Sequence, residues 1–240
     1  MPRFFVSEIT GGKAVIAGAD ALHLAKALRV RPGELITVCD PKGVDHICAV
    51  EQVSPEAVVA AVTQSRPACS EPPAAITLYQ ALCKGDKFET VVQKAVELGA
   101  GRIVPVVTGR CVSRPDPDSL RKKTERWQKI AVAAAKQSGR GVVPRVEQAL
   151  DYPQAASQLA AHKLSILFYE NATEPLGRAL RDIPDDVGIM TGPEGGFETA
   201  EVELAAGLGV AVCSLGPRIL RCETAPLAAL SILTAVLEIL

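Results

Sequence analysis

The feature that most restricts the fold of this chain is a regular alternation of short apolar runs and amphipathic stretches after residue 75. Strand-like runs lie at residues 76–82, 102–107, 164–170, 187–192 and 210–215. Stretches with helical periodicity lie between and after them, at residues 86–99, 119–139, 198–209 and from about 225 onward. Strands that alternate with helices in this way build a parallel sheet with helices on both faces. The sequence therefore predicts an α/β domain.

The first part of the chain has a different pattern. Short β-type runs lie at residues 13–16, 35–39, 46–53 and 57–62, and one helical piece lies at residues 20–30. Closely spaced short strands of this kind are typical of a small barrel. A stretch rich in proline and small residues, 66–75, separates the two patterns and reads as a linker. We expect a small domain over residues 1–70 and a larger one over residues 74–240.

Composition excludes several classes of protein. The seven cysteines are an odd number with no CxxC pair, which argues for reduced thiols in a cytoplasmic protein and against a disulfide framework or a zinc site. The three histidines are dispersed, and no metal is expected. The most apolar segment, 225–240, is shorter than the ~20 residues of a membrane span and contains Glu238, so no membrane association is expected.

The net charge of −1 conceals a strong segregation of charge. Residues 84–145 carry fourteen Lys and Arg against six Asp and Glu, whereas residues 147–213 carry three against eleven. A basic block on a nearly neutral protein indicates a surface for a polyanion. Solvated helix faces are the alternative explanation.

Three segments directly follow predicted strands and are candidates for a binding site: 169–175, 191–197 and 215–224. Ligands in open α/β sheets bind beyond the carboxyl ends of the strands. Glycines at 192, 195 and 196 allow close approach to the backbone, although glycine and proline also mark ordinary turns. The chain has no GxxxxGK[ST], GxGxxG, GxSxG or HExxH motif, so the sequence gives no sign of a P-loop, a dinucleotide fingerprint, a serine nucleophile elbow or a zinc protease site. What remains is a site where a cosubstrate supplies the reactive group. Methyl transfer from S-adenosylmethionine fits that description, but the pattern alone does not single it out.

The segment SLGPRILRCETAPLAAL, residues 214–230, places Arg218, Arg221 and Glu223 in a turn between two apolar segments. A plain connection needs only the glycine and proline, so the charges indicate that something binds there. Salt bridges from the arginines to Glu223 or Glu194 are the alternative.

Five separated segments carry a family resemblance: PRFFV, KGDKFETVVQKAVELGAGRIVPV, ERWQKIAVAAAKQSGR, GPEGGF and LGPRILRCETAPLAAL. In order and spacing they closely resemble the RsmE family, ribosomal RNA uridine-N3 methyltransferases of the SPOUT superfamily. The resemblance runs from Pro2 to about Leu233. One departure is Cys222, which stands where the family usually has threonine.

The resemblance implies a PUA-like barrel at the N-terminus and a SPOUT domain whose last helix passes through a deep trefoil knot, an exception to the rule that knots are absent. It implies a homodimer that binds S-adenosylmethionine in the knot and methylates N3 of a uridine in 16S ribosomal RNA of the small subunit or of its assembly intermediate. The residues implied in cofactor binding are Phe168, Tyr169, Glu170, Asn171, Thr191, Gly192, Pro193, Glu194, Gly195, Gly196, Ser214, Leu215, Gly216, Ile219, Leu220 and Arg221.

Arg218 and Arg221 are the catalytic candidates for stabilising negative charge on the uracil oxygens. Glu223 is a candidate general base, with helix capping as an equal alternative, and Glu194 carries the same ambiguity. Trp127, at helical spacing, is expected in the core rather than under a base. The RNA-binding candidates are Arg3, Arg29, Arg31, Lys84, Lys87, Arg110, Arg114, Arg121, Lys122, Lys123, Arg126 and Arg140.

Two other functions remain open from the sequence. One is a non-catalytic RNA-binding factor in ribosome assembly. The other is a SPOUT enzyme that methylates a ribose 2′-hydroxyl or a guanine nitrogen.

Overall fold

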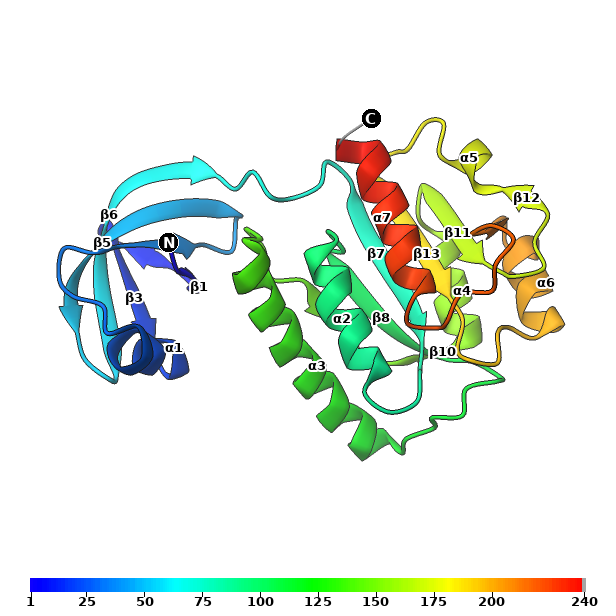
Figure 1. The fold of residues 1–240 in the computed structure, drawn as a ribbon, viewed down its shortest axis with the longest axis horizontal. Coiled ribbons are helices and arrows are strands. Elements are labelled where there is room, and N and C mark those ends of the chain that lie inside the picture. The colour runs from blue at the N-terminus through cyan, green and yellow to red at the C-terminus, as the bar shows by residue number, and fades with distance from the viewer. Residues whose placement is uncertain (239–240) are drawn as a thin grey trace. The chain divides into compact units, whose positions relative to one another are not determined.

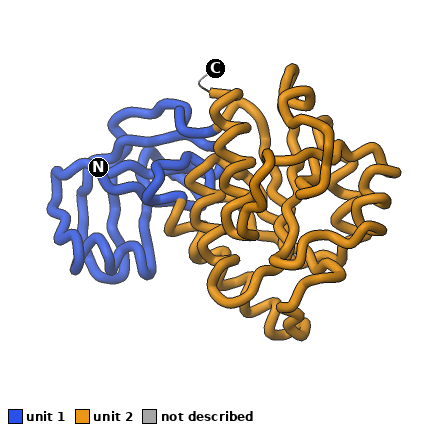
Figure 2. Tube along the Cα trace, turned by 45° about the vertical axis from the view of Figure 1, so that its right-hand side comes forward, with its two compact units in different colours: residues 1–71, 135–143 blue, residues 72–134, 144–240 orange. Residues whose placement is uncertain are grey.

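The computed structural model describes residues 1–238, which group into two units (Figure 2). Unit 1 contains residues 1–71 and 135–143, and unit 2 contains residues 72–134 and 144 onward. The sequence predicts an uninterrupted domain from residue 74, whereas the structure groups residues 135–143 with the N-terminal part.

Unit 1 is built on a six-stranded sheet with the order β1-β4-β5-β6-β3-β2. Only the β1–β4 pair is parallel; the other pairs are antiparallel. The strands are β1 (Arg3–Phe5), β2 (Ile9–Thr10), β3 (Lys13–Ala17), β4 (Leu35–Cys39), β5 (Val44–Val53) and β6 (Ala57–Pro67). The sequence predicts a small barrel here, and the structure has a mostly antiparallel, half-barrel sheet. Strand β6 extends to Pro67, into the stretch that the sequence suggests as a linker.

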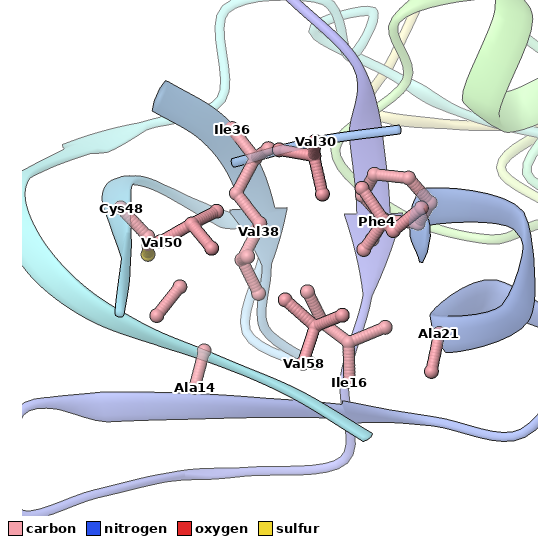
Figure 3. Close-up of a cluster of buried hydrophobic side chains, with 12 residues drawn as sticks. Phe4, Ala14, Ile16, Ala21, Val30, Ile36, Val38, Cys48, Val50 and Val58 are labelled. Atoms are coloured by element: carbon pink, nitrogen blue, oxygen red, sulfur yellow. The ribbon is translucent and has the colours of Figure 1, made fainter. Parts of the chain in front are cut away.

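Alternate residues of these strands form the core of unit 1. Ile36 and Val38 of β4, Val58 of β6 and Ile16 of β3 are fully or almost fully buried in one cluster (Figure 3). Short helical segments α1 (Ala19–Leu22) and η1 (His23–Leu28) follow β3 and add Ala21 and Leu24 to that cluster.

Unit 2 contains one entirely parallel sheet with the order β10-β8-β7-β13-β11-β14-β12, and β9 also pairs with β8. The strands are β7 (Ala75–Ala81), β8 (Arg102–Val107), β9 (Arg145–Val146), β10 (Leu150–Asp151), β11 (Leu164–Phe168), β12 (Glu174–Pro175), β13 (Asp186–Thr191) and β14 (Ala211–Ser214). The predicted parallel α/β sheet is confirmed. Because all strands run the same way, their carboxyl ends share one edge.

Helices cover both faces of this sheet (Figure 1). The helices are α2 (Lys87–Glu97), α3 (Pro117–Ser138), α4 (Tyr152–Ala160), α5 (Leu176–Ala179), α6 (Thr199–Gly207) and α7 (Ala225–Glu238). Tyr79, Leu167 and Met190 face one side, where they pack with residues of α4 and α6. Helices α2 and α7 contact each other, and α7 also contacts β13.

Two details of the helices follow from local sequence. Helix α6 begins with a capping box, in which Glu198 and Glu201 each accept a hydrogen bond from a backbone amide of the first turn. Helix α7 is predominantly apolar and buries Ala229, Leu230 and Leu233. No helix in residues 1–238 combines the length and the hydropathy that a membrane crossing requires.

Candidate active site

A cleft of about 280 Å³ lies at the carboxyl ends of β11, β13 and β14, which are neighbours in the sheet. The three segments that follow these strands form its walls. Its lining residues are Phe168, Tyr169, Glu170, Thr191, Gly192, Pro193, Glu194, Gly195, Gly196, Phe197, Ser214, Leu215, Gly216, Arg218, Ile219, Leu220, Cys222 and Ala225.

The structure brings together all of the cofactor-binding candidates except Asn171 and Arg221. The Asn171 amide instead donates a hydrogen bond to the Tyr169 hydroxyl at 3.2 Å, and Arg221 is exposed outside the lining. The cleft is also lined by Phe197, Cys222 and Ala225, which are absent from the list of cofactor-binding candidates. Phe197 and Cys222 lie within the predicted segments 191–197 and 215–224, and Ala225 directly follows the second segment.

Two glycines keep the cleft wall open. Gly196 has φ +67°, and a Cβ at this position would lie 2.7 Å from a Glu170 carboxylate oxygen. At Gly192, a Cβ would lie 3.3 Å from the Phe197 ring. A side chain at Gly196 would be strained by conformation as well as by contact, because L-residues rarely adopt this region. The wall at this point is therefore exposed backbone.

A buried hydrogen-bond pair fixes the end of β13. Thr191 is fully buried, and its hydroxyl donates to the Gln80 side-chain oxygen at 2.7 Å. The Gln80 amide nitrogen donates to the Ala81 carbonyl at 2.9 Å. These bonds join the carboxyl ends of two adjacent strands, and so they hold the loop after β13 in place.

A charged cluster joins α2 to the turn before α7. Lys87 Nζ lies 3.1 Å from Glu223 Oε2 and 3.7 Å from Glu194 Oε1. The pKa of Glu223 is lowered by its own backbone amide, by the Cys222 thiol and by Lys87. Burial works to raise the pKa of Glu194, but the Lys84 amide, its own amide, the Cys222 thiol and Lys87 together lower it. Both carboxylates therefore stay ionised at neutral pH.

These contacts decide one question that the sequence left open. Within residues 1–238, neither Arg218 nor Arg221 forms an ion pair, so the alternative that they bridge Glu223 or Glu194 is wrong. Lys87 has that role, because α2 delivers its ammonium group to both carboxylates. Arg218 lines the cleft, whereas Arg221 is exposed outside the lining.

The RNA-binding candidates divide into two groups. Lys84, Arg29, Arg31, Lys122 and Lys123 are exposed, and within residues 1–238 none of them forms an ion pair. The others have partners in the fold.

Two of those partnered residues are corrections. Arg140 is only 3% exposed, and it binds Glu71 through two nitrogens at 2.9 and 2.6 Å. Arg3 is paired with Asp45 at 2.7 Å and is largely buried. Both side chains are used inside unit 1, and neither presents its charge to an external polyanion.

Of the remaining candidates, Lys87 is half-buried and pairs with Glu194 and Glu223. The other four combine exposure with local contacts. Arg110 donates to the Gly195 carbonyl at 3.1 Å, and Arg114 donates to the carbonyls of Thr108 and Gly109. Arg126 pairs with Glu89 at 2.8 Å, and Arg121 lies 3.4 Å from Asp118.

Trp127 is confirmed as a core residue. It is 3% exposed, and its ring centroid lies 4.2 Å from that of Phe88 on α2. It offers no face for stacking of a base.

Comparison with known proteins agrees with this geometry. A family model described as an RNA methyltransferase domain matches residues 70–234. The ribosomal RNA small subunit methyltransferase E of Bacillus subtilis is 34% identical over 232 residues, which cover 94% of this chain and 91% of that protein. The protein of the same name from Synechocystis is 33% identical over 96% of this chain and 76% of its own length.

A solved structure is similar over almost the whole chain. The crystal structure of ribosomal RNA small subunit methyltransferase E from Neisseria gonorrhoeae, bound to S-adenosyl methionine, has a TM-score of 0.87 and 33% identity, and the match covers 98% of each chain. This similarity confirms the SPOUT-type fold. The chain therefore belongs to the RNA methyltransferase family that includes the ribosomal RNA small subunit methyltransferase E proteins.

Proposed function

We propose that this protein is an S-adenosylmethionine-dependent methyltransferase that modifies N3 of a uridine in the RNA of the small ribosomal subunit. The observation that carries the proposal is the glycine-walled cleft at the carboxyl ends of β11, β13 and β14. The related protein from Neisseria gonorrhoeae, similar over 98% of both chains, is described as bound to S-adenosyl methionine.

The residues of the cleft fit this cosubstrate. Exposed backbone at Gly192 and Gly196 supplies amides and carbonyls for a polar ligand, and Phe168, Leu215 and Leu220 supply apolar surface. Such a mixture of a few placed polar groups on an apolar wall is typical of small-molecule sites. When bound, S-adenosylmethionine supplies a methyl group on a positively charged sulfur.

The protein's own part in the reaction is to orient the uracil and to balance charge. Loss of the N3 proton leaves negative charge on the uracil oxygens, and a cation beside them lowers the barrier. Arg218 lines the cleft without an ion pair among residues 1–238, and we assign it this role, with Arg221 beside it as a ligand for the base or its phosphate.

Glu223 is a weaker candidate for the general base than the sequence suggests. A base works best when its pKa lies near the operating pH, whereas the contacts of this carboxyl lower its pKa. Its pairing with Lys87 at 3.1 Å supports a positioning role for the turn that carries Arg221.

RNA binding is assigned to the exposed cations. Lys84, Lys122 and Lys123 of unit 2 and Arg29 and Arg31 of unit 1 are available for phosphates. Phosphate contacts give affinity that falls with salt and carries little sequence information. The target uridine must be unstacked before it can enter the cleft.

The proposal includes two further points. The resemblance implies a homodimer whose second chain completes the active site, and ribosomal RNA as substrate implies a cytoplasmic enzyme. Sedimentation analysis of the purified chain tests the first point, and a monomer that retains full activity would contradict it.

The central test has two parts. Calorimetry of the purified chain with S-adenosylmethionine should show binding, whereas a purely RNA-binding assembly factor should show none. Mass spectrometry of small-subunit RNA from a deletion strain should then show one uridine that lacks its N3 methyl group. Loss of a ribose or guanine methyl group instead would assign the enzyme to a different RNA methyltransferase class.

The roles of the arginines are tested by kinetics. Arg218→Ala should lower kcat by 10²-fold or more, in the range found for removal of one charge-stabilising donor, while S-adenosylmethionine binding is retained. Arg178→Ala is a matched control, because Arg178 is an exposed arginine that pairs with Glu174 outside the cleft. Unchanged turnover in Arg218→Ala would remove this residue from the mechanism.

A further inference from the structure

Three potential metal ligands meet beside the cleft although they are far apart in the sequence. Cys83 follows β7, Glu194 lies in the loop after β13, and Cys222 lies in the turn before α7. Their two sulfur atoms and one carboxylate oxygen all lie within 4.8 Å of one another. Cys83 is 4% exposed and Cys222 is 6% exposed, so both thiols are shielded from bulk solvent. The spacing of the cysteines gives no sign of this cluster.

We propose that Cys83, Glu194 and Cys222 bind a thiophilic divalent cation, such as Zn²⁺ or its spectroscopic substitute Cd²⁺. Thiolate sulfur and carboxylate oxygen are ligands that zinc accepts in a tetrahedral arrangement. Metal–ligand distances of 2.0–2.3 Å place neighbouring ligand atoms about 3.5–4 Å apart. The three ligand atoms, which lie within 4.8 Å of one another, are within about an ångström of that spacing.

Groups around the three ligands hold them in position. The Lys84 amide donates to Glu194 Oε1 at 3.0 Å, and the Gln80 side-chain amide lies 3.6 Å from the Cys83 sulfur. Lys87 Nζ lies 3.9 Å from the Cys222 sulfur. Hydrogen bonds of this kind to ligand atoms orient them and tune their basicity at metal sites. The cluster therefore has both the ligands and the groups that support them.

Metal binding must release protons. Each thiol loses its S–H proton to form a metal–sulfur bond, and the Glu194 carboxylate is already ionised. In the metal-free chain, the Cys222 thiol donates to Glu223 Oε2 at 3.2 Å, and this hydrogen bond is lost when the sulfur binds the ion. The protons of both thiols pass to the solvent, two for each ion bound. Two thiolates, one carboxylate and a divalent ion sum to a charge of −1, which the ammonium group of Lys87 opposes from beside Cys222.

Three protein ligands leave the fourth tetrahedral position of the cation for water or another small ligand. Glu194 and Cys222 both line the cleft. An ion held there would change the charge and shape of the cleft wall. If the proposed function is correct, on which this consequence rests, the metal-loaded chain binds S-adenosylmethionine more weakly than the metal-free chain.

The test is a Cd²⁺ titration of the full-length chain. Cys69 is the one exposed cysteine and is first replaced by serine, so that surface thiols do not contribute. The metal-free protein is kept reduced with a phosphine, and the thiolate-to-cadmium ultraviolet band and the protons released are both measured. We expect one tight site with a band intensity of two thiolates.

Variants assign the band to the cluster. Cys83→Ser and Cys222→Thr should each lower Cd²⁺ affinity by more than the ~100-fold that loss of a supporting group costs. Glu194→Gln should keep the two-thiolate band at reduced affinity. Cys48→Ala is the matched control, since Cys48 is a buried thiol in unit 1, and its affinity should equal that of the parent.

Two results would overturn the proposal: no charge-transfer band in the parent chain, or a band of unchanged intensity and affinity in Cys222→Thr. Cys222→Thr replaces the thiol with another small polar side chain, so it keeps the proposal testable if Cys83→Ser does not fold. Calorimetry with S-adenosylmethionine, with and without Cd²⁺, separates the two proposals. A metal-free chain that fails to bind S-adenosylmethionine contradicts the proposed function but leaves the cadmium band intact.

Discussion

Replacement of Arg140 by methionine should destabilise unit 1 without weakening RNA binding. The Arg140 guanidinium is almost completely buried and makes a two-pronged contact with Glu71, whose carboxylate also accepts the amides of Gly141 and Val142. Methionine keeps the apolar stem of the side chain but leaves the Glu71 carboxylate without its cation.

The magnitude follows from the burial of the two partners. Breaking a buried ion pair by removing one partner costs about 3–5 kcal/mol, because a charge is left without compensation. The Glu71 side chain is 28% exposed and keeps two amide donors, so water and the backbone relieve part of that cost. We expect the lower end of the range, about 3 kcal/mol. For a unit of about 80 residues, this lowers Tm by roughly 12 °C or more.

Two probes report the two units separately. The single tryptophan, Trp127, lies in unit 2, so its fluorescence follows that unit during urea denaturation. Hydrogen exchange of the β4 and β5 amides, read by mass spectrometry, follows unit 1. Arg140→Met should speed exchange in β4 and β5, and RNA affinity and its salt dependence should not change.

A double-mutant cycle completes the experiment. In Arg140→Met/Glu71→Gln no buried charge is left alone, so the double variant should be more stable than the sum of the single effects by about 1–2 kcal/mol. Exchange in β4 and β5 that stays at the wild-type rate in Arg140→Met, together with a loss of RNA affinity, would refute this reasoning. It would restore Arg140 as an RNA contact.

Three more predictions follow from the site and its surroundings. In Gly196→Ala the left-handed conformation costs the L-residue about 1–2 kcal/mol, and the loop relieves this strain by moving out of its binding position. The variant should therefore bind S-adenosylmethionine about tenfold more weakly in calorimetry. Gly207→Ala, where a Cβ meets nothing within 4 Å, should bind normally, and equal affinities in the two variants would contradict the role of the wall. Charge reversal of Lys122 and Lys123 should flatten the slope of RNA affinity against salt by about two phosphate contacts, and an unchanged slope would exclude this patch. Burial works to raise the pKa of the Glu71 carboxyl, but Arg140 and two backbone amides lower it overall. The stabilisation that the ionised Glu71 gives to unit 1 is therefore fully present above the usual pKa of 4.5 and is lost as the pH falls through the lower pKa of the folded state. Urea titrations of Glu71→Gln at pH 3–5 should lack this decline in stability.

The strand pattern alone predicts most of the sheet in unit 2. Apolar runs at 76–82, 102–107 and 187–192 correspond to β7, β8 and β13, because each strand is buried on both faces and shows as a continuous run in the sequence. Helix α4 at Tyr152–Ala160 escaped prediction. Helix α4 is short and follows a two-residue strand, so the sequence of neither element is long enough to show a helical or strand periodicity.

The charged residues were predicted less well, for a physical reason. Whether Arg140 faces solvent or Glu71 depends on a partner 69 residues away, and no local pattern encodes that choice. The same limit applies to Cys83 and Cys222, which meet only when β7 and the turn before α7 lie at the same edge of the sheet. The position of a loop can be inferred from its strand, but the partner of a side chain within it cannot.

The charges around the turn at residues 214–224 are arranged so that, within residues 1–238, its two arginines form no ion pair and can meet an anionic ligand. Arg218 and Glu194 line the cleft, Lys87 and Glu223 join Glu194 in one ion-paired cluster, and Arg221 is exposed outside the lining. If an arginine paired with Glu223, its charge would be screened from an incoming anion. Lys87 instead satisfies both carboxylates from the side of α2, 3.1 Å from Glu223 and 3.7 Å from Glu194. Removing the Lys87 charge would leave the two carboxylates to compete for the arginines, so Lys87→Met should weaken RNA binding and lower turnover even though Lys87 itself touches neither RNA nor uracil in this scheme.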